Sequence, residues 1–276
     1  MNISRDVIIY KGKAGLASFG VFLCFALAMS FIAYQFWYPG YLFWLDGGVQ
    51  GLSLVFSVDL VLGPLMILVF FHPGKSRRML VFDIAVAAIV QASAMVWGYY
   101  QVYTQRPAAI IYDSRAGNFV SATARILKAQ KGGLDAVQKL SEARPPYVYQ
   151  RPPATQQERD ASTQALWGNG IAAPYQIFLY VPVKNYLDQI FARQQAFKNY
   201  LAAHFSREWQ QWSRESNADD QRYALFQGRY ASGIVRFSAQ GNYEAFVRLP
   251  GDGSLPQELL PVAPHPPGRQ RIPVSQ

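Results

Sequence analysis

The sequence predicts a membrane protein in which three transmembrane α-helices are followed by an α+β domain on the outer side of the membrane. Three apolar runs, at about 16–37, 51–71 and 79–103, each have the ~20 residues that a helix needs to cross a bilayer. The chain after these runs is more polar and mixes strand-like and helix-like patterns. The expected division is therefore a cytoplasmic N-terminus (1–15), a three-helix transmembrane domain (16–103), a periplasmic α+β domain (104–249) and a disordered tail rich in Pro and Gly (250–276).

The first apolar run has two interpretations, a cleaved signal peptide or a retained helix. It follows Arg5, Lys11 and Lys13, and Ala26-Leu27-Ala28 has the small-x-small pattern of a cleavage site. Hydrophobicity continues well past that triplet, as far as Trp37, where an exported domain would normally turn polar. This continuation favours a retained helix.

The distribution of basic residues predicts the orientation. The loop 38–50 has no Lys or Arg, whereas the loop 72–78 carries Lys75, Arg77 and Arg78. Because positive residues stay on the cytoplasmic side, three crossings would leave everything after about residue 104 outside the cytoplasm. We therefore expect a multi-pass protein of the bacterial inner membrane with a periplasmic C-terminal domain.

Composition excludes several classes of function. The 26 basic and 17 acidic residues give a net charge of +9, but they are interspersed and form no dense basic block, so no nucleic-acid partner is expected. A single cysteine, Cys24, allows neither an intrachain disulfide nor a Cys-type metal site. His72, His204 and His265 lie far apart, and no serine has a nucleophile-elbow context. We predict no catalytic residues, metal or cofactor; an enzyme without a recognisable sequence pattern is the alternative.

Asp59 is the polar residue most in need of an explanation, because a carboxylate in the middle of a bilayer is costly without compensation. It could bond to a neighbouring helix of this protein or contact a polar group on another protein's membrane helix. A proton relay is less favoured, because Asp83 is the other acid in the runs and lies near Arg77. Gly63-Pro64 would remove a backbone hydrogen bond and could expose carbonyl groups to a partner.

The third apolar run places small residues at Ala85, Ala88 and Ala92 close to one helical face. Small residues at this spacing let a second helix approach closely. The face could close the three-helix bundle or form a docking groove for another protein.

Several short motifs follow one another in a characteristic order: WYPG at 37–40, LDGGVQG at 45–51, VDLVLGPLMILVF at 58–70, LVFD at 80–83 and QRP at 105–107. Over about residues 16–120 the chain resembles the type IV pilin accessory proteins of the TfpX/TfpZ group, also called FimB-like. The motif residues are Trp37, Pro39, Gly40, Asp46, Gly47, Gly48, Gly51, Asp59, Gly63 and Pro64.

The resemblance implies a non-enzymatic, chaperone-like factor of type IV pilus biogenesis. Its expected partners are the major pilin, inner-membrane lipid and the pilus assembly machinery. The hypothetical pilin contacts are Asp59, Gly63, Pro64, Ala85, Ala88 and Ala92. A pilin helix with an acid near its start would repel an ionised Asp59, so one carboxyl group would have to be protonated or the contact made by the pilin's amino terminus. A membrane-anchored periplasmic sensor or a transporter subunit is the alternative function.

Patterns in the outer part predict individual elements. A hairpin is expected from 108–113 and 118–123, and a capping box at Thr155 and Glu158 begins a helix that ends near Trp167. Apolar residues at helical steps predict one long helix over 183–213, whose aromatic stripe is more typical of a core than of a binding surface. The remaining expectations are a helical segment at 124–140 interrupted by Gly132-Gly133, an extended connector at 143–153, and strands at 175–181, 223–226, 233–237 and 243–249.

Overall fold

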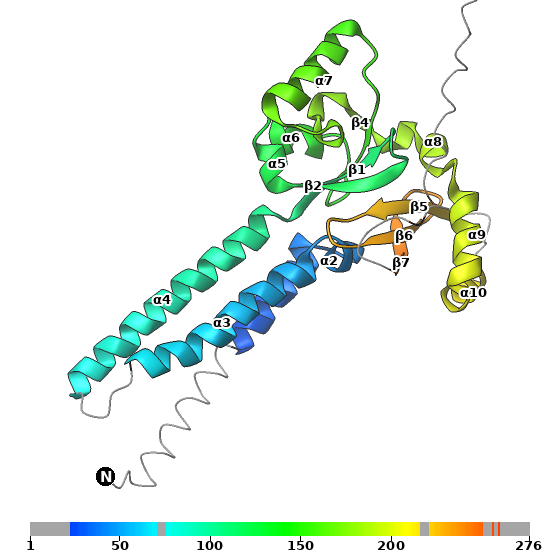
Figure 1. The fold of residues 1–276 in the computed structure, drawn as a ribbon. Helices are drawn as coiled ribbons and strands as arrows, with labels where there is room; N and C mark the ends of the chain where they lie inside the picture. The colour runs from blue at the N-terminus through cyan, green and yellow to red at the C-terminus, as the bar shows by residue number, and fades with distance from the viewer. Residues whose placement is uncertain (1–22, 71–75, 216–220, 251–255, 257–258, 260–276) are drawn as a thin grey trace, which may run out of the picture.

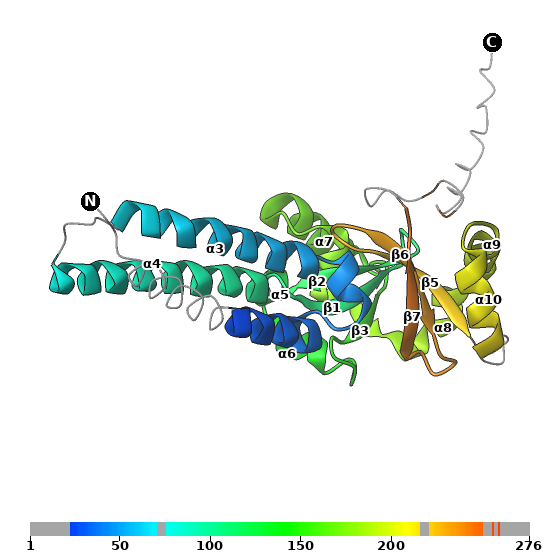
Figure 2. The ribbon, with the colours of Figure 1, turned by 90° about the horizontal axis from the view of Figure 1, so that it is seen from below.

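A computed structural model of the chain describes residues 23–70, 76–215, 221–250, 256 and 259. Figure 1 shows two parts: a long helical arm and a sheet domain from which the arm projects. The arm consists of the helix Leu23–Trp37, which ends in a π-helical turn at Ala33–Trp37, together with α3 (Gly48–Phe70) and α4 (Arg77–Thr104). In Figure 2 these helices run side by side away from the strands.

The expectation of three transmembrane helices followed by a domain is wrong, and so is the multi-pass location derived from it. Within the described residues, one helix, Val81–Thr104, is long and apolar enough to cross a membrane. In the other two runs the described apolar helices, Leu23–Trp37 and Gly48–Val58, are shorter. Part of their apolar sequence serves contacts inside the protein, since Ala33, Tyr38, Leu52 and Val55 are buried in a cluster with Tyr99 and Val102 of α4. The basic residues at 5–13, before the first run, and Lys75 of the loop 72–78 lie outside the described residues.

Two glycines let α3 and α4 lie close together. A Cβ atom on Gly51 of α3 would lie 3.1 Å from Cγ2 of Val102, and one on Gly98 of α4 would lie 3.0 Å from Cγ2 of Val55. Each valine therefore packs against the partner helix where that helix lacks a side chain. Gly51 and Gly98 are thus small residues at the contact between α3 and α4, whereas Ala85, Ala88 and Ala92 of α4 are exposed.

The sheet is seven-stranded and mixed, in the order β4-β3-β1-β2-β5-β6-β7. The pairs β1–β3 and β2–β5 are parallel, and the other neighbours are antiparallel. The expected hairpin is confirmed as β1–β2, with Ile110 opposite Ser121 and Asp113 opposite Asn118. The strands are β1 (Pro107–Asp113), β2 (Asn118–Thr123), β3 (Tyr147–Gln150), β4 (Tyr180–Pro182), β5 (Arg222–Gln227), β6 (Ser232–Phe237) and β7 (Tyr243–Arg248).

Both faces of the sheet are covered, as alternating burial along the strands requires. One face, with Tyr112, Phe119 and Phe226, packs against α8 and against the short helix α2 (Tyr41–Leu45). The opposite face is covered in two halves, by α5 and α6 over β1 and β3 and by α9 and α10 over β5 to β7. The helices are α5 (Ala124–Lys128), α6 (Gly133–Gln138), α7 (Gln156–Asn169), α8 (Leu187–Phe191), α9 (Gln194–His204) and α10 (Ser206–Glu215).

The single long helix expected over 183–213 is wrong. The chain forms a 3₁₀ turn at Val183–Asn185 and then α8, α9 and α10, with a break in helical backbone at Phe205. The breaks let the apolar residues pack on both faces of the sheet. Ile190 and Phe191 pack with Phe237 on one face, whereas Phe197 and Leu201 pack with Tyr223 on the other. The aromatic stripe is core, as expected.

Other local expectations had mixed outcomes. The capping box at Thr155 and Glu158 is present at the start of α7, and the segment 124–140 divides into α5 and α6 around Gly132-Gly133. The strand expected at 175–181 is instead mostly two 3₁₀ turns, followed by the short β4. The tail after Pro250 lies outside the described residues except for Pro256 and Leu259.

Candidate functional site at the base of the helical arm

The segment 38–48 connects the arm to the sheet domain, and its helix α2 is part of the domain core. The ring of Tyr41 lies 4.9 Å, between centroids, from those of Phe226 and Tyr243. Its hydroxyl lies 2.9 Å from the Tyr147 hydroxyl. The carbonyl of Leu45 accepts the backbone N–H groups of Tyr230 and Ala231 at 3.2 and 3.1 Å. The aromatic-rich segment 38–48 thus covers part of one face of the sheet.

Asp46, directly after α2, is buried and forms a partly buried ion pair with Arg229. The guanidinium Nε donates to Oδ1 of Asp46 at 3.2 Å, and Nη2 donates to Oδ2 at 3.2 Å. Nη2 also donates to the carbonyl of Gln105, at the C-terminal end of α4, at 2.9 Å. Nearby, the Tyr38 hydroxyl donates to the carbonyl of Val102 at 3.1 Å. Arg229 therefore joins the start of α3, the end of α4 and the β5–β6 turn.

Burial sets the electrostatics of this junction. The Asp46 side chain is 0% exposed and that of Arg229 is 28% exposed. Burial opposes the charged guanidinium, but the contacts with Asp46 and Tyr38 together outweigh it, and the pKa of Arg229 rises above its ordinary value. Burial raises the pKa of Tyr38 to about 12, although Arg229 acts in the opposite direction. Arg229 therefore stays charged and Tyr38 stays a neutral hydrogen-bonding group at ordinary pH.

The glycines of the 37–51 motif are required by backbone geometry. Gly40 and Gly47 have φ of 61° and 107°, which side-chain-bearing residues rarely adopt. A Cβ atom on Gly48 would lie 2.9 Å from Cα of Phe43. These residues shape the turn that brings Asp46 to Arg229, so the first half of the motif has a structural explanation.

An open groove of about 1010 Å³ lies beside this junction, and we call it the basal groove. Its walls come from the end of the first helix, the start of β1, the 138–147 loop, the residues after β4 and the β6–β7 turn. Arg106, Lys139, Arg144 and Lys184 line it, together with one acid, Glu142. Phe36 and Trp37 add an aromatic wall.

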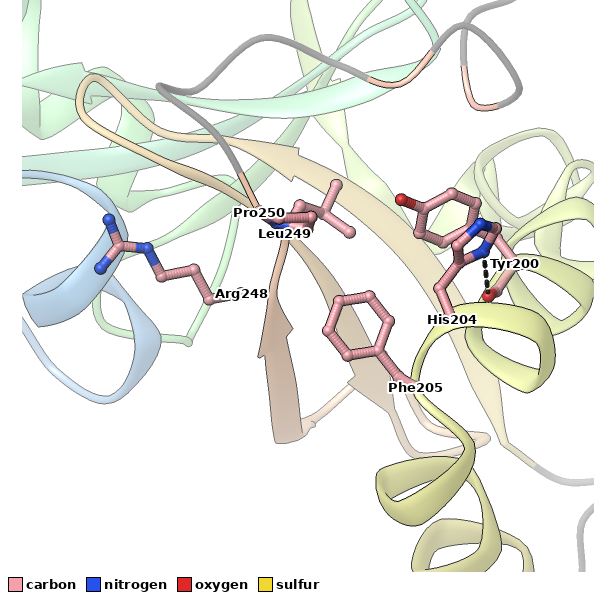
Figure 3. A pocket seen from close by; sticks show the side chains of 6 residues that line it. All are labelled: Tyr200, His204, Phe205, Arg248, Leu249 and Pro250. Atoms are coloured by element: carbon pink, nitrogen blue, oxygen red, sulfur yellow. Dashed lines mark hydrogen bonds between the residues drawn. The ribbon is translucent and has the colours of Figure 1, made fainter.

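A second, smaller pocket lies between α9 and the end of β7 (Figure 3). Its volume is about 520 Å³, and Tyr200, His204, Phe205 and Arg248 are among the residues that line it. Nδ1 of His204 lies 3.2 Å from the carbonyl of Tyr200, while Arg248 extends away from both residues in the figure. The pocket thus brings no acid, base and nucleophile together.

The hypothetical pilin contacts fall on both long helices of the arm. Asp59, Gly63 and Pro64 belong to α3, but their side chains lie outside the described residues. Ala85, Ala88 and Ala92 are exposed on α4. The arm therefore leaves the alanine face open. Within the described part of the chain, no cluster of three or more His, Cys, Asp or Glu could hold a metal ion.

Sequence reasoning missed Arg229 and the basic residues of the groove. Asp46 gave a partial signal, because it is the one charged residue in the loop 38–50 and a buried acid needs a cation. That cation lies 183 residues away. Sequence spacing offers no means of locating it.

Together, the fold and the site define an α+β protein in which a partly buried ion pair joins a helical arm to a mixed sheet. The chain is similar to two Dichelobacter nodosus proteins, the fimbrial assembly proteins of serogroup I and serogroup E1, with 23% identity over 111 residues in each case. The matched part is 40% of this chain and 43% of each relative, so less than half of those relatives' length is spanned. The fimbrial assembly protein of serogroups C1 and C2 is 22% identical over 40% of this chain and 85% of its own length. No family model and no solved structure matches the chain.

Proposed function

We propose that this protein is a non-enzymatic accessory factor of type IV fimbrial assembly that binds the pilin subunit and supports its stability or its incorporation into the fibre. The similarity to fimbrial assembly proteins supports a role in fimbrial assembly. The names of these relatives mention no enzymatic activity. The motifs at 37–51 and 58–70 support the narrower assignment to pilin.

The open alanine face of α4 is the observation that carries pilin binding. Ala85, Ala88 and Ala92 are exposed there, and large apolar side chains elsewhere on α4 are exposed as well, with Phe82 at 69% and Ile89 at 66%. An exposed apolar surface of this extent is typical of an interaction site. The small side chains let a second helix come close, and a pilin subunit offers a single long apolar helix.

The rest of the site supports this role by holding the arm in one orientation. Because Arg229 links both long helices of the arm to the sheet domain, a helix docked on α4 also has a defined position relative to the basal groove. The proposal includes Asp59, Gly63 and Pro64 on α3 as further contacts.

Site-specific photocrosslinking in intact cells tests the proposal. A benzoylphenylalanine in place of Ala88 is expected to trap the pilin subunit. The same probe in place of Trp167, which is 83% exposed on α7, serves as the matched control and is expected to trap none. Trapping of other proteins but no pilin from Ala88, or equal trapping from both positions, would overturn the proposal.

A further inference from the structure

The basal groove carries a positive charge that the described residues leave without a salt bridge. Lys139, Arg144 and Lys184 are exposed, and the guanidinium of Arg106 lies 3.9 Å over the Tyr103 ring. Among the described residues, none of these cations and not Glu142 takes part in a salt bridge. The lining therefore presents cations in excess, and they come from separate segments of the chain.

An apolar wall lies beside these cations. Phe36 is 70% exposed at the edge of the groove, and Trp37 and Leu187 also line it. The volume of about 1010 Å³ is at the upper end of the range for small-ligand sites, which is roughly 300–1,000 Å³. A compact inorganic anion would leave the apolar wall unused.

An extended polypeptide matches both kinds of wall. Successive side chains of an extended chain point in opposite directions, so acidic residues can face the cations while alternate apolar residues face Phe36 and Leu187. Because the cations lie on the α4–β1 junction, the 138–147 loop and the segment after β4, they can pair with acids spaced along such a segment. A lipid headgroup carries its phosphate at a single point and fits this spread less well.

We propose that the basal groove binds an acidic, extended polypeptide segment of the protein's assembly partner, with apolar residues between the acids. That the partner is pilin rests on the proposed function, whereas the chemistry of the segment rests on the groove alone. The inference thus assigns the exposed alanine face and the basal groove to two different parts of one partner.

Binding of defined peptides to the purified full chain in a mild non-ionic detergent tests the groove without reference to pilin. The probes are fluorescein-labelled ten-residue peptides in which Leu alternates with Asp, Ser or Lys. The test variant combines Lys139→Gln, Arg144→Gln and Lys184→Gln. Its matched control combines Lys128→Gln, Lys131→Gln and Arg207→Gln, which remove the same charge from exposed positions outside the groove.

The Asp-Leu peptide is expected to bind more tightly than the Ser-Leu peptide, and the groove variant to bind it about tenfold more weakly, since each exposed ion pair contributes a factor of roughly two to three. The control variant should bind within about twofold of the parent, and circular dichroism should show all chains folded. Equal binding of the Asp-Leu and Ser-Leu peptides, or equal loss in both variants, overturns the proposal. Vesicles of phosphatidylglycerol and phosphatidylethanolamine form the last arm: if the parent binds them but shows no preference for the acidic peptide, the groove is a lipid site and the proposal is wrong.

The two proposals fail separately. If pilin is trapped from Ala88 while the acidic peptide does not bind, the groove inference is wrong and the proposed pilin binding is supported. If the acidic peptide binds but no pilin is trapped, the groove keeps its chemistry and belongs to another partner.

Discussion

Removal of the Asp46 carboxylate by Asp46→Ala should destabilise the protein strongly. The carboxylate is fully buried, and the substitution leaves the partly exposed guanidinium of Arg229 without its counter-charge. Breaking a buried ion pair in this way costs about 3–5 kcal/mol. We expect a value near 3 kcal/mol, because the 28% exposure of Arg229 lets water replace part of the lost interaction.

The loss is measured by urea unfolding of the full chain in a mild non-ionic detergent. Trp209 and Trp212 pack against Tyr223 of β5, so their fluorescence reports the sheet domain. With a slope of about 2 kcal/mol per molar urea, the midpoint should fall by about 1.5 M. The double variant with Arg229→Met should be clearly more stable than the sum of the single losses predicts, because it removes both charges.

Arg151→Met is the comparison: the two arginines are similarly exposed, but the Glu158 carboxylate is 26% exposed where that of Asp46 is 0% exposed, so this pair should contribute much less to global stability. A loss below about 1 kcal/mol for Asp46→Ala would refute the reasoning, since a pair removed from water should cost more. Strict additivity in the double variant would refute it as well.

Three further changes test other parts of the structure. Gly228→Ala should destabilise by about 1–3 kcal/mol in the same urea assay, because the new Cβ would lie 2.2 Å from the Leu45 carbonyl oxygen. Gly98→Leu should separate α4 from α3 at Val55 and speed proteolysis of the arm. Hydrogen bonds from Arg151 and the 154 backbone hold the pKa of Glu158 at about 2, so the stability it gives to the start of α7 should be complete above about pH 4.5 and lost as the pH falls through about 2, as followed by NMR titration of its carboxyl carbon.

Each change has a matched control. Gly168→Ala in α7 places its Cβ 3.6 Å from the nearest atom and should be neutral or slightly stabilising, since alanine favours a helix. Ala88→Leu adds the same side chain as Gly98→Leu on the open face of α4 and should leave proteolysis unchanged. Glu142→Gln should leave the pH dependence of α7 unchanged, because Glu142 forms no salt bridge among the described residues. The opposite ranking within any pair would contradict the corresponding contact.

Local sequence signals predicted local structure well. The hairpin at 108–123 and the capping box at 155–158 depend on neighbouring residues, and both formed where expected. The helix expected over 183–213 failed because its apolar residues divide between two clusters, which is a property of the tertiary fold. Periodicity shows that a residue is buried and leaves open which surface buries it.

The apolar first third misled the prediction for a related reason. Hydrophobicity indicates removal from water, but Tyr41, Leu42 and Leu45 are removed from water by the sheet, and Leu52 and Val55 by the neighbouring helix α4. Of the candidate site, the motif glycines and Asp46 could be found from sequence. The basal groove could not, because its walls come from segments between residues 35 and 242 that only the fold brings together.

The distance along the chain between Asp46 and Arg229 also bears on biosynthesis. The carbonyl of Leu45 and the carboxylate of Asp46 accept hydrogen bonds from residues 229–231. The ribosome adds these donors after most of the chain has been made, so the bonds can form only then. The core of the sheet domain therefore completes only near the end of synthesis, and an expressed fragment that begins at β1 lacks the helix that closes one face of its sheet. A shortened version for biophysical work should therefore include residues 38–48, for instance attached by a linker to the C-terminal end of the fragment.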